Sequence, residues 1–262
     1  MQYKLIGLDM DGTLLNSKHE VTQNTQSVLK ECMEKGIKVV LASGRLWESM
    51  YAFTKHLGLV DEYVSLNGAI ITSPKDQQKV FKSFIKDEEY HYLLHQLKDI
   101  KMPVYVFDMD RYYTQKNWDD KESMEEISGV KAELIEDFYS IQHPTKILLS
   151  FQNEEEIKAL TERIKHPDYK LIRTGFNYIE IVRKCISKGE AIRWIAQKYG
   201  VHKEEILTIG DSENDIEMLS YAGLGIAMDN AAPNVKAVAD TITDSCDNEG
   251  VAKAIKKYVL KK

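Results

Sequence analysis

The chain has few cysteines, and their arrangement excludes a disulfide framework. Cys32, Cys185 and Cys246 are the three cysteines among 262 residues, and none of them belongs to a Cys-x-x-Cys pair. Domains that depend on disulfides carry a denser and usually even set of cysteines, and they occur in oxidising compartments. We therefore expect a protein of the reducing cytoplasm.

The sequence also lacks segments that would direct the chain into a membrane. No window approaches the roughly 20 apolar residues that a membrane-spanning helix needs. Charges interrupt the apolar stretch of residues 1–15, and no small-residue cleavage site follows it, so we expect no signal peptide. Internal repeats and low-complexity segments are absent as well.

Positive charge is in deficit. The chain has 35 Lys and Arg against 41 Asp and Glu, which gives a net charge of −6. Because nucleic-acid surfaces need clustered Lys and Arg, this balance argues against a nucleic-acid partner, but not against a small anionic ligand. The hydrophobic fraction of 43% is that of an ordinary globular protein. A chain of this length can form one large domain or two smaller ones.

Strand and helix patterns alternate near both ends of the chain, which predicts a parallel sheet. In the first part we expect strands over residues 3–8, 37–42 and 63–66 and helices over residues 22–35 and 46–57. From residue 188 onward we expect strands over 206–209 and 224–227 and helices over 189–199, 215–221, 233–238 and 250–258.

The middle third has a different character. Residues 104–107 and 112–114 read as a hairpin, and the strands expected over 170–173 and 178–182 flank a turn at Gly175. Hairpins mixed with helices indicate an α+β layer. We therefore expect a Rossmann-like α/β core with a parallel sheet, built from residues 1–82 and 185–262, and an α+β cap domain inserted over 83–184.

Two carboxylates stand one residue apart where the first strand is predicted to end, in Asp9-Met10-Asp11-Gly12-Thr13. Ligands of open parallel sheets bind beyond the carboxyl ends of the strands. As the chain turns out of a strand, residues i and i+2 can converge on one site while the residue between them turns its amide inward. We therefore expect chemistry, rather than packing, from Asp9 and Asp11.

Three further polar sites are predicted at the same edge of the core. They are Ser43-Gly44-Arg45 after the second strand, Lys188 at the start of a helix, and Gly210-Asp211-Ser212-Glu213-Asn214-Asp215 after the strand over 206–209. Together these sites offer carboxylates, a hydroxyl, amides and one cation.

This set of groups suits phosphoryl transfer, which demands mainly positioning and charge neutralisation. Carboxylate oxygens of Asp9, Asp11 and Asp211 suit Mg²⁺, which is usually held by few protein ligands. The Ser43 hydroxyl, the Gly44 amide and Lys188 suit the remaining phosphate oxygens. One carboxylate of the first pair could attack phosphorus while its neighbour moves the proton.

The chain resembles the haloacid dehalogenase (HAD) superfamily, specifically its Cof-type phosphatases with a large type IIB cap. The resemblance covers nearly the whole chain, and the order and spacing of its motifs make it specific. Ser43 stands where many relatives carry Thr, which preserves the hydroxyl. The matching stretches, besides the three already quoted, are Asn67-Gly68-Ala69, Ser187-Lys188-Gly189 and Gly225-Ile226-Ala227-Met228-Asp229-Asn230-Ala231.

The resemblance implies a role for each matching residue. Asp9 is expected to be the nucleophile that forms an aspartyl-phosphate, and Asp11 the acid that protonates the leaving alcohol and then activates water. Asp215 would support the metal and Lys188. The implied Mg²⁺ ligands are Asp9, the backbone carbonyl of Asp11, and Asp211. The implied phosphate-binding groups are the Met10 amide, Ser43, Gly44, Lys188 and Asn214.

The implied activity is Mg²⁺-dependent hydrolysis of phosphate monoesters of small metabolites, with sugar phosphates favoured. A receiver-like signalling module that accepts phosphate on Asp, and a HAD phosphatase of pyridoxal phosphate or flavin mononucleotide, remain as alternatives. A dehalogenase needs no acid at position 11. The sequence does not distinguish a monomer from a homodimer. Candidates for contacts with the leaving group are Arg45, Arg173, Asn177 and Glu180.

Overall fold

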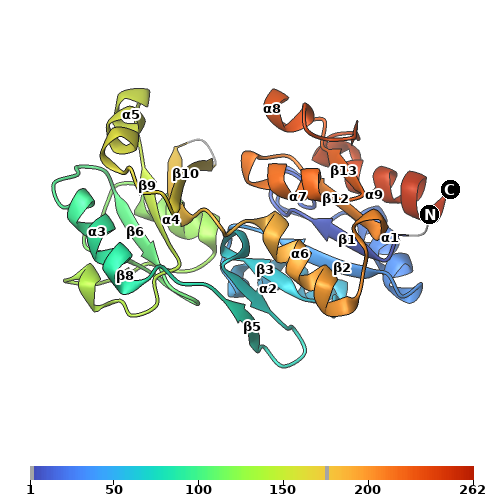
Figure 1. The fold of residues 1–262 in the computed structure, drawn as a ribbon. Coiled ribbons are helices and arrows are strands. Elements are labelled where there is room, and N and C mark those ends of the chain that lie inside the picture. Colours follow the sequence, from blue (N-terminus) through green and yellow to red (C-terminus); the bar gives the residue numbers. More distant parts are fainter. Residues whose placement is uncertain (1–2, 175–176) are drawn as a thin grey trace. The chain divides into compact units, whose positions relative to one another are not determined.

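The chain forms two units in the computed structural model, which describes residues 3–174 and 177–262 apart from the side chains of residues 121, 123, 126 and 127 (Figure 1). The core unit comprises Met1–Phe81 and Ser187–Lys262, and the inserted unit comprises Lys82–Ile186. The turn predicted at Gly175 lies outside the described residues.

An eight-stranded sheet forms the centre of the core unit, in the order β14-β13-β12-β1-β2-β3-β4-β5. All pairs from β14 to β3 are parallel, and β4 runs antiparallel to β3. The strands are β1 (Leu5–Leu8), β2 (Lys38–Ala42), β3 (Tyr63–Ser65), β4 (Ile70–Thr72), β5 (Lys79–Lys82), β12 (Ile206–Gly210), β13 (Leu224–Ala227) and β14 (Thr241–Ile242).

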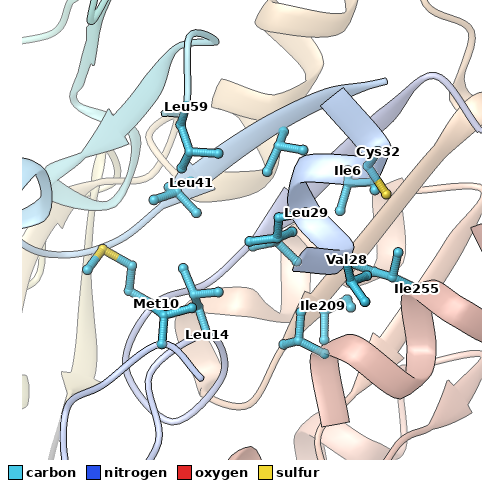
Figure 2. Close-up of a cluster of buried hydrophobic side chains, with 14 of the residues drawn as sticks. Ile6, Met10, Leu14, Val28, Leu29, Cys32, Leu41, Leu59, Ile209 and Ile255 are labelled. Atoms are coloured by element: carbon cyan, nitrogen blue, oxygen red, sulfur yellow. The ribbon is translucent and has the colours of Figure 1, made fainter. Parts of the chain in front are cut away.

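Helices cover both faces of this sheet, so its central strands are almost wholly apolar. Successive side chains of β1 enter two different hydrophobic clusters. Ile6 packs with α1 (Gln23–Glu34) and α9 (Gly250–Ile255), whereas Leu5 packs with α6 (Lys188–Tyr199) and α7 (Ile216–Tyr221). Figure 2 shows the first cluster, in which side chains from β1, α1, β2, β12 and α9 gather. At Gly7 a Cβ would lie 2.9 Å from Ile192 Cδ1, so glycine permits the close approach of α6.

Two helices of the core unit, α1 and α6, begin at residues with the expected capping chemistry. Thr22 caps α1 by accepting from the Thr25 amide, and Ser187 caps α6 by accepting from the Glu190 amide. Gly200 ends α6 in the left-handed conformation. The helices of the core unit are α1 (Gln23–Glu34), α2 (Trp47–Thr54), α6 (Lys188–Tyr199), α7 (Ile216–Tyr221), α8 (Pro233–Lys236) and α9 (Gly250–Ile255).

The inserted unit has a six-stranded sheet in the order β10-β11-β9-β6-β7-β8. Its strands pair antiparallel, except for the parallel pair β7 and β8. Helices α3 and α5 pack against the sheet in one hydrophobic cluster. The elements are β6 (Val104–Phe107), β7 (Tyr112–Thr114), β8 (Glu133–Leu134), β9 (Lys146–Ser150), β10 (Tyr169–Thr174), β11 (Tyr178–Arg183), α3 (Asp87–Leu97), α4 (Lys121–Ser128) and α5 (Glu154–Arg163).

The predicted fold class is confirmed: a parallel α/β sheet is assembled from both ends of the chain, and a mixed α and β unit is inserted between them. The helix predicted over 46–57 is α2 followed by a 3₁₀ turn, Lys55–Leu57. The helix predicted over 250–258 is α9 followed by a π-helical segment, Lys256–Leu260. Within residues 3–174 and 177–262, no helix is long and apolar enough to span a membrane.

Candidate active site at the carboxyl edge of the core sheet

The loop after β1 is folded back on its own backbone. The Asp9 amide donates to the Ile209 carbonyl at 3.0 Å, which extends the pairing with β12 beyond the end of β1. The amides of Leu14 and Leu15 donate to the carbonyls of Asp9 and Met10, at 3.3 and 2.8 Å. Because the Met10 side chain is also buried in the core, the backbone that joins the two predicted carboxylates is anchored.

Close contacts tie this loop to Asp211 at the end of β12. Gly12 has φ +78°, which favours glycine, and a Cβ there would lie 2.6 Å from Asp211 Oδ2 and displace that carboxylate. Thr13 Oγ1 donates to Asp211 Oδ1 at 2.8 Å, and Asn230 Nδ2 donates to the Gly12 carbonyl at 2.8 Å. Sequence reasoning assigned no role to Thr13 or Asn230, although both belong to motifs that carried the resemblance.

Lys188 joins two carboxylates from distant parts of the chain. Its ammonium donates to Asp9 Oδ1 at 2.6 Å and to Asp215 Oδ1 at 2.7 Å, and its side chain is 1% exposed. Burial by itself lowers the pKa of Lys188, but the attraction of Asp215 and Asp9 outweighs burial and raises the pKa above its ordinary value. Lys188 therefore stays charged.

The site holds more negative charge than this one lysine neutralises. Carboxylate oxygens of Asp9, Asp211 and Asp215 lie within 4.8 Å of one another. Burial, followed by repulsion from Asp215, raises the pKa of Asp9 well above its ordinary value, although Lys188 opposes this shift. The same two causes raise the pKa of Asp211. No donor from the described residues reaches the buried Oδ2 of Asp9. The three clustered carboxylates and their surplus negative charge fit a hard divalent cation.

Asp215 has a partner on both oxygens. Oδ1 accepts from Lys188, and Oδ2 accepts from the amides of Asp211 and Ser212, each at 3.0 Å. The side chain is completely buried. Asp215 thus orients the lysine and fixes the backbone that carries Asp211.

Asp11 lies apart from this carboxylate group. Arg45 donates to both of its oxygens, through Nε to Oδ2 and through Nη2 to Oδ1, each at 2.7 Å. The guanidinium is held in turn by Ser49 Oγ at 3.0 Å and by the ring of Phe53. The Asp11 side chain is 44% exposed, against 6% for Asp9. The two carboxylates of the opening motif therefore occupy different environments.

The remaining predicted groups lie around the turn after β2. Ser43 is buried, and its hydroxyl accepts from the Arg45 amide at 3.2 Å. A Cβ at Gly44 would lie 3.2 Å from Asn67 Oδ1, and this same oxygen accepts from Asn214 Nδ2 at 3.0 Å. The structure thus brings Gly44 and Asn214 to a shared neighbour, Asn67, to which the sequence assigned no role.

Two leaving-group candidates lie in the inserted unit with partners of their own. Glu180 is 2% exposed and accepts from Lys146 at 2.6 Å. This ion pair is buried, so Glu180 already has a charged partner within the inserted unit, and its contact with a leaving group stays a prediction. Arg173 pairs with Glu154 at 2.8 Å and lies over the ring of Phe151.

Comparison with known proteins decides the family. The family described as haloacid dehalogenase-like hydrolase matches residues 6–255. The chain belongs to the haloacid dehalogenase superfamily. The phosphatase YwpJ of Bacillus subtilis is 30% identical over 97% of this chain and 99% of its own length. From the same organism, 5-amino-6-(5-phospho-D-ribitylamino)uracil phosphatase YitU is 27% identical, over 97% of each chain.

Solved structures of the haloacid dehalogenase superfamily agree. The HAD subclass IIB sugar phosphatase BT4131 superposes with a TM-score of 0.86 at 26% identity, over 97% of this chain and 98% of its own. These findings confirm the predicted family and its Cof-type branch, and the chain is a phosphatase. The family therefore favours a phosphatase over a receiver-like module.

Proposed function

We propose that this phosphatase hydrolyses phosphate monoesters of small metabolites in a Mg²⁺-dependent reaction that passes through an aspartyl-phosphate on Asp9. The observation that carries the proposal is the state of the Asp9 carboxylate. One oxygen is held by Lys188, and the other is buried with no donor from the described residues. A carboxylate fixed by one oxygen presents the other as a nucleophile in a defined direction.

Each residue of the site has a distinct task in this proposal. Asp9 attacks phosphorus, and Asp11, the more exposed carboxylate, protonates the leaving alcohol and then takes a proton from the attacking water. Lys188 supplies fixed positive charge for the phosphate oxygens. The phosphate-binding set is completed by the Met10 amide, Ser43, Gly44 and Asn214.

We assign the metal to Asp9, Asp211 and the backbone carbonyl of Asp11. Bound Mg²⁺ would offset the negative charge shared by the phosphate and the carboxylates. Asp215, with both oxygens already engaged, would support Lys188 and the Asp211 backbone rather than bind the metal directly.

Mg²⁺ is expected to raise the melting temperature (Tm) of the wild-type protein. A cation that binds the folded state alone stabilises it in proportion to the logarithm of its concentration. Asp211→Asn removes a proposed ligand and should abolish most of this increase, which differential scanning fluorimetry with and without EDTA would measure. Asp244→Asn is the matched control, because Asp244 is an exposed carboxylate paired with Lys253. This variant should keep the full increase in Tm. An undiminished increase in Asp211→Asn would contradict the assignment.

We propose that the inserted unit, predicted over residues 83–184, is the cap that sets specificity, with sugar phosphates as the favoured substrate class. The likeness to a sugar phosphatase supports this class, while the ribitylaminouracil phosphatase among the relatives points to a phosphorylated sugar alcohol. We expect a panel of metabolites to give the highest kcat/KM for a sugar phosphate. A highest value for pyridoxal phosphate or flavin mononucleotide would identify a cofactor phosphatase instead.

Turnover tests the proposed activity itself. The purified chain with Mg²⁺ should release phosphate from p-nitrophenyl phosphate, and EDTA should stop the reaction. Asp11→Asn should fail mainly on substrates with poor leaving groups, because general-acid assistance matters most there. Turnover that is unaffected by EDTA would contradict the metal-dependent mechanism.

A further inference from the structure

Three consecutive residues after β3 adopt left-handed backbone conformations. The φ angles are +51° at Leu66, +55° at Asn67 and +103° at Gly68. Glycine adopts such angles freely and asparagine tolerates them, but for leucine they are costly. Backbone strain of this kind persists only where the surroundings impose it, and it clusters at functional sites.

The surroundings of this turn are the proposed phosphate-binding elements. The Asn67 amide donates to the Ser43 carbonyl at 2.9 Å, and the Leu66 amide donates to the Arg45 carbonyl at 3.0 Å. At Gly68 a Cβ would lie 2.3 Å from the Ser187 carbonyl oxygen, so the turn lies directly against the residue that precedes Lys188. One strained turn therefore contacts both the loop after β2 and the start of α6.

The Asn67 side chain reaches a third element. Its Oδ1 accepts from Asn214 Nδ2 at 3.0 Å, and its amide group packs on Gly44 where a Cβ would stand. The Oδ1 of Asn214 is buried, and no described residue donates to it. The bond to Asn67 therefore decides which way the Asn214 amide faces. Since an amide nitrogen carries two protons, one remains for a ligand.

We propose that Asn67 is a positioning residue for the phosphate-binding site: it orients the amide of Asn214. This inference rests on the proposed function. Asparagine suits the task because it combines tolerance of the left-handed conformation with an uncharged acceptor. Aspartate would keep the acceptor but place a negative charge beside the phosphate.

Asn67→Gly separates the side chain from the backbone, because glycine keeps the left-handed turn and removes only the acceptor. We expect the dissociation constant of inorganic phosphate, measured by calorimetry in the presence of Mg²⁺, to rise about tenfold, the usual effect of losing one hydrogen bond. Asn67→Ser, whose side chain is too short to reach Asn214, is the second variant and should give the same change.

A double-mutant cycle distinguishes positioning from general loosening of the fold. In an Asn214→Ala background, Asn67→Gly should weaken phosphate binding less than about twofold, since the group that it orients is already absent. An equal loss in both backgrounds, or no loss in either, would overturn the inference. Asn24→Ala is the matched control, because Asn24 also donates a side-chain hydrogen bond, to Glu249, and it should leave phosphate binding unchanged.

Failure of the inference and failure of the proposed function give different results. If the wild-type chain neither binds inorganic phosphate nor releases it from p-nitrophenyl phosphate, both are wrong. If the wild-type chain does both and Asn67→Gly matches it, the inference alone is wrong.

Discussion

Asp9→Asn is expected to lower kcat for p-nitrophenyl phosphate by about 10⁴-fold or more, because an amide cannot replace the attacking carboxylate. Asparagine has nearly the same shape, so the fold should be retained. A stopped assay at saturating substrate and Mg²⁺ measures the loss. Turnover within about tenfold of the wild type would contradict the assignment of Asp9 as nucleophile.

The same variant should be more stable than the wild type when Mg²⁺ is absent. The pKa of Asp9 is raised in the folded state, so its contribution to stability is present at acidic pH and is lost as pH rises through that pKa. The amide introduced by Asp9→Asn does not titrate. The Tm difference between variant and wild type should therefore become more positive from acidic to neutral pH, as measured by thermal denaturation in EDTA. Asp244→Asn should show no such trend, and a flat difference for Asp9→Asn would refute the account of its environment.

Lys188→Met is expected to change stability in the opposite direction. Methionine fills a similar volume but leaves the buried carboxylates of Asp9, Asp211 and Asp215 without their cation. Removing one partner of a buried ion pair typically costs about 3–5 kcal/mol of folding free energy. Urea denaturation in EDTA would measure the loss, and Mg²⁺ should restore part of it by supplying positive charge. Activity should fall together with stability, because the phosphate loses the same cation.

Arg193→Met provides the matched comparison in the same helix. Arg193 pairs with Glu190, and the two side chains are 46% and 45% exposed. Exposed ion pairs contribute about 0–1 kcal/mol, so this variant should lose little stability and should not respond to Mg²⁺ differently from the wild type. Equal losses of stability for the two variants would show that the burial of Lys188 does not determine its contribution.

The sequence predicted the core sheet well because its central strands are buried on both faces. Apolar runs such as residues 3–8 and 206–209 therefore stood out from their polar flanks. The strands β8 and β14 were missed. Each has two residues and is partly or wholly exposed, so neither leaves a hydrophobic pattern in the sequence.

The sequence predicted which helices and strands carry the candidate site, but not which side chains pair with each other there. Asp9 and Lys188 are 179 positions apart, and they could be brought together because both flank core elements at one edge of a parallel sheet. The bidentate contact between Arg45 and Asp11, and the bond between Asn67 and Asn214, depend on rotamers and on a strained turn. Composition and spacing carry no signal for either.

The most direct test of the account is to trap the covalent intermediate. Asp11→Asn should still be phosphorylated by p-nitrophenyl phosphate, whose leaving group needs little acid assistance, but should hydrolyse the phosphoenzyme slowly because it lacks the base. After acid quench in the presence of Mg²⁺, peptide mass spectrometry is predicted to find the phosphoryl group on Asp9. A phosphoryl group on another residue, or substrate turnover with none on Asp9, would contradict the account.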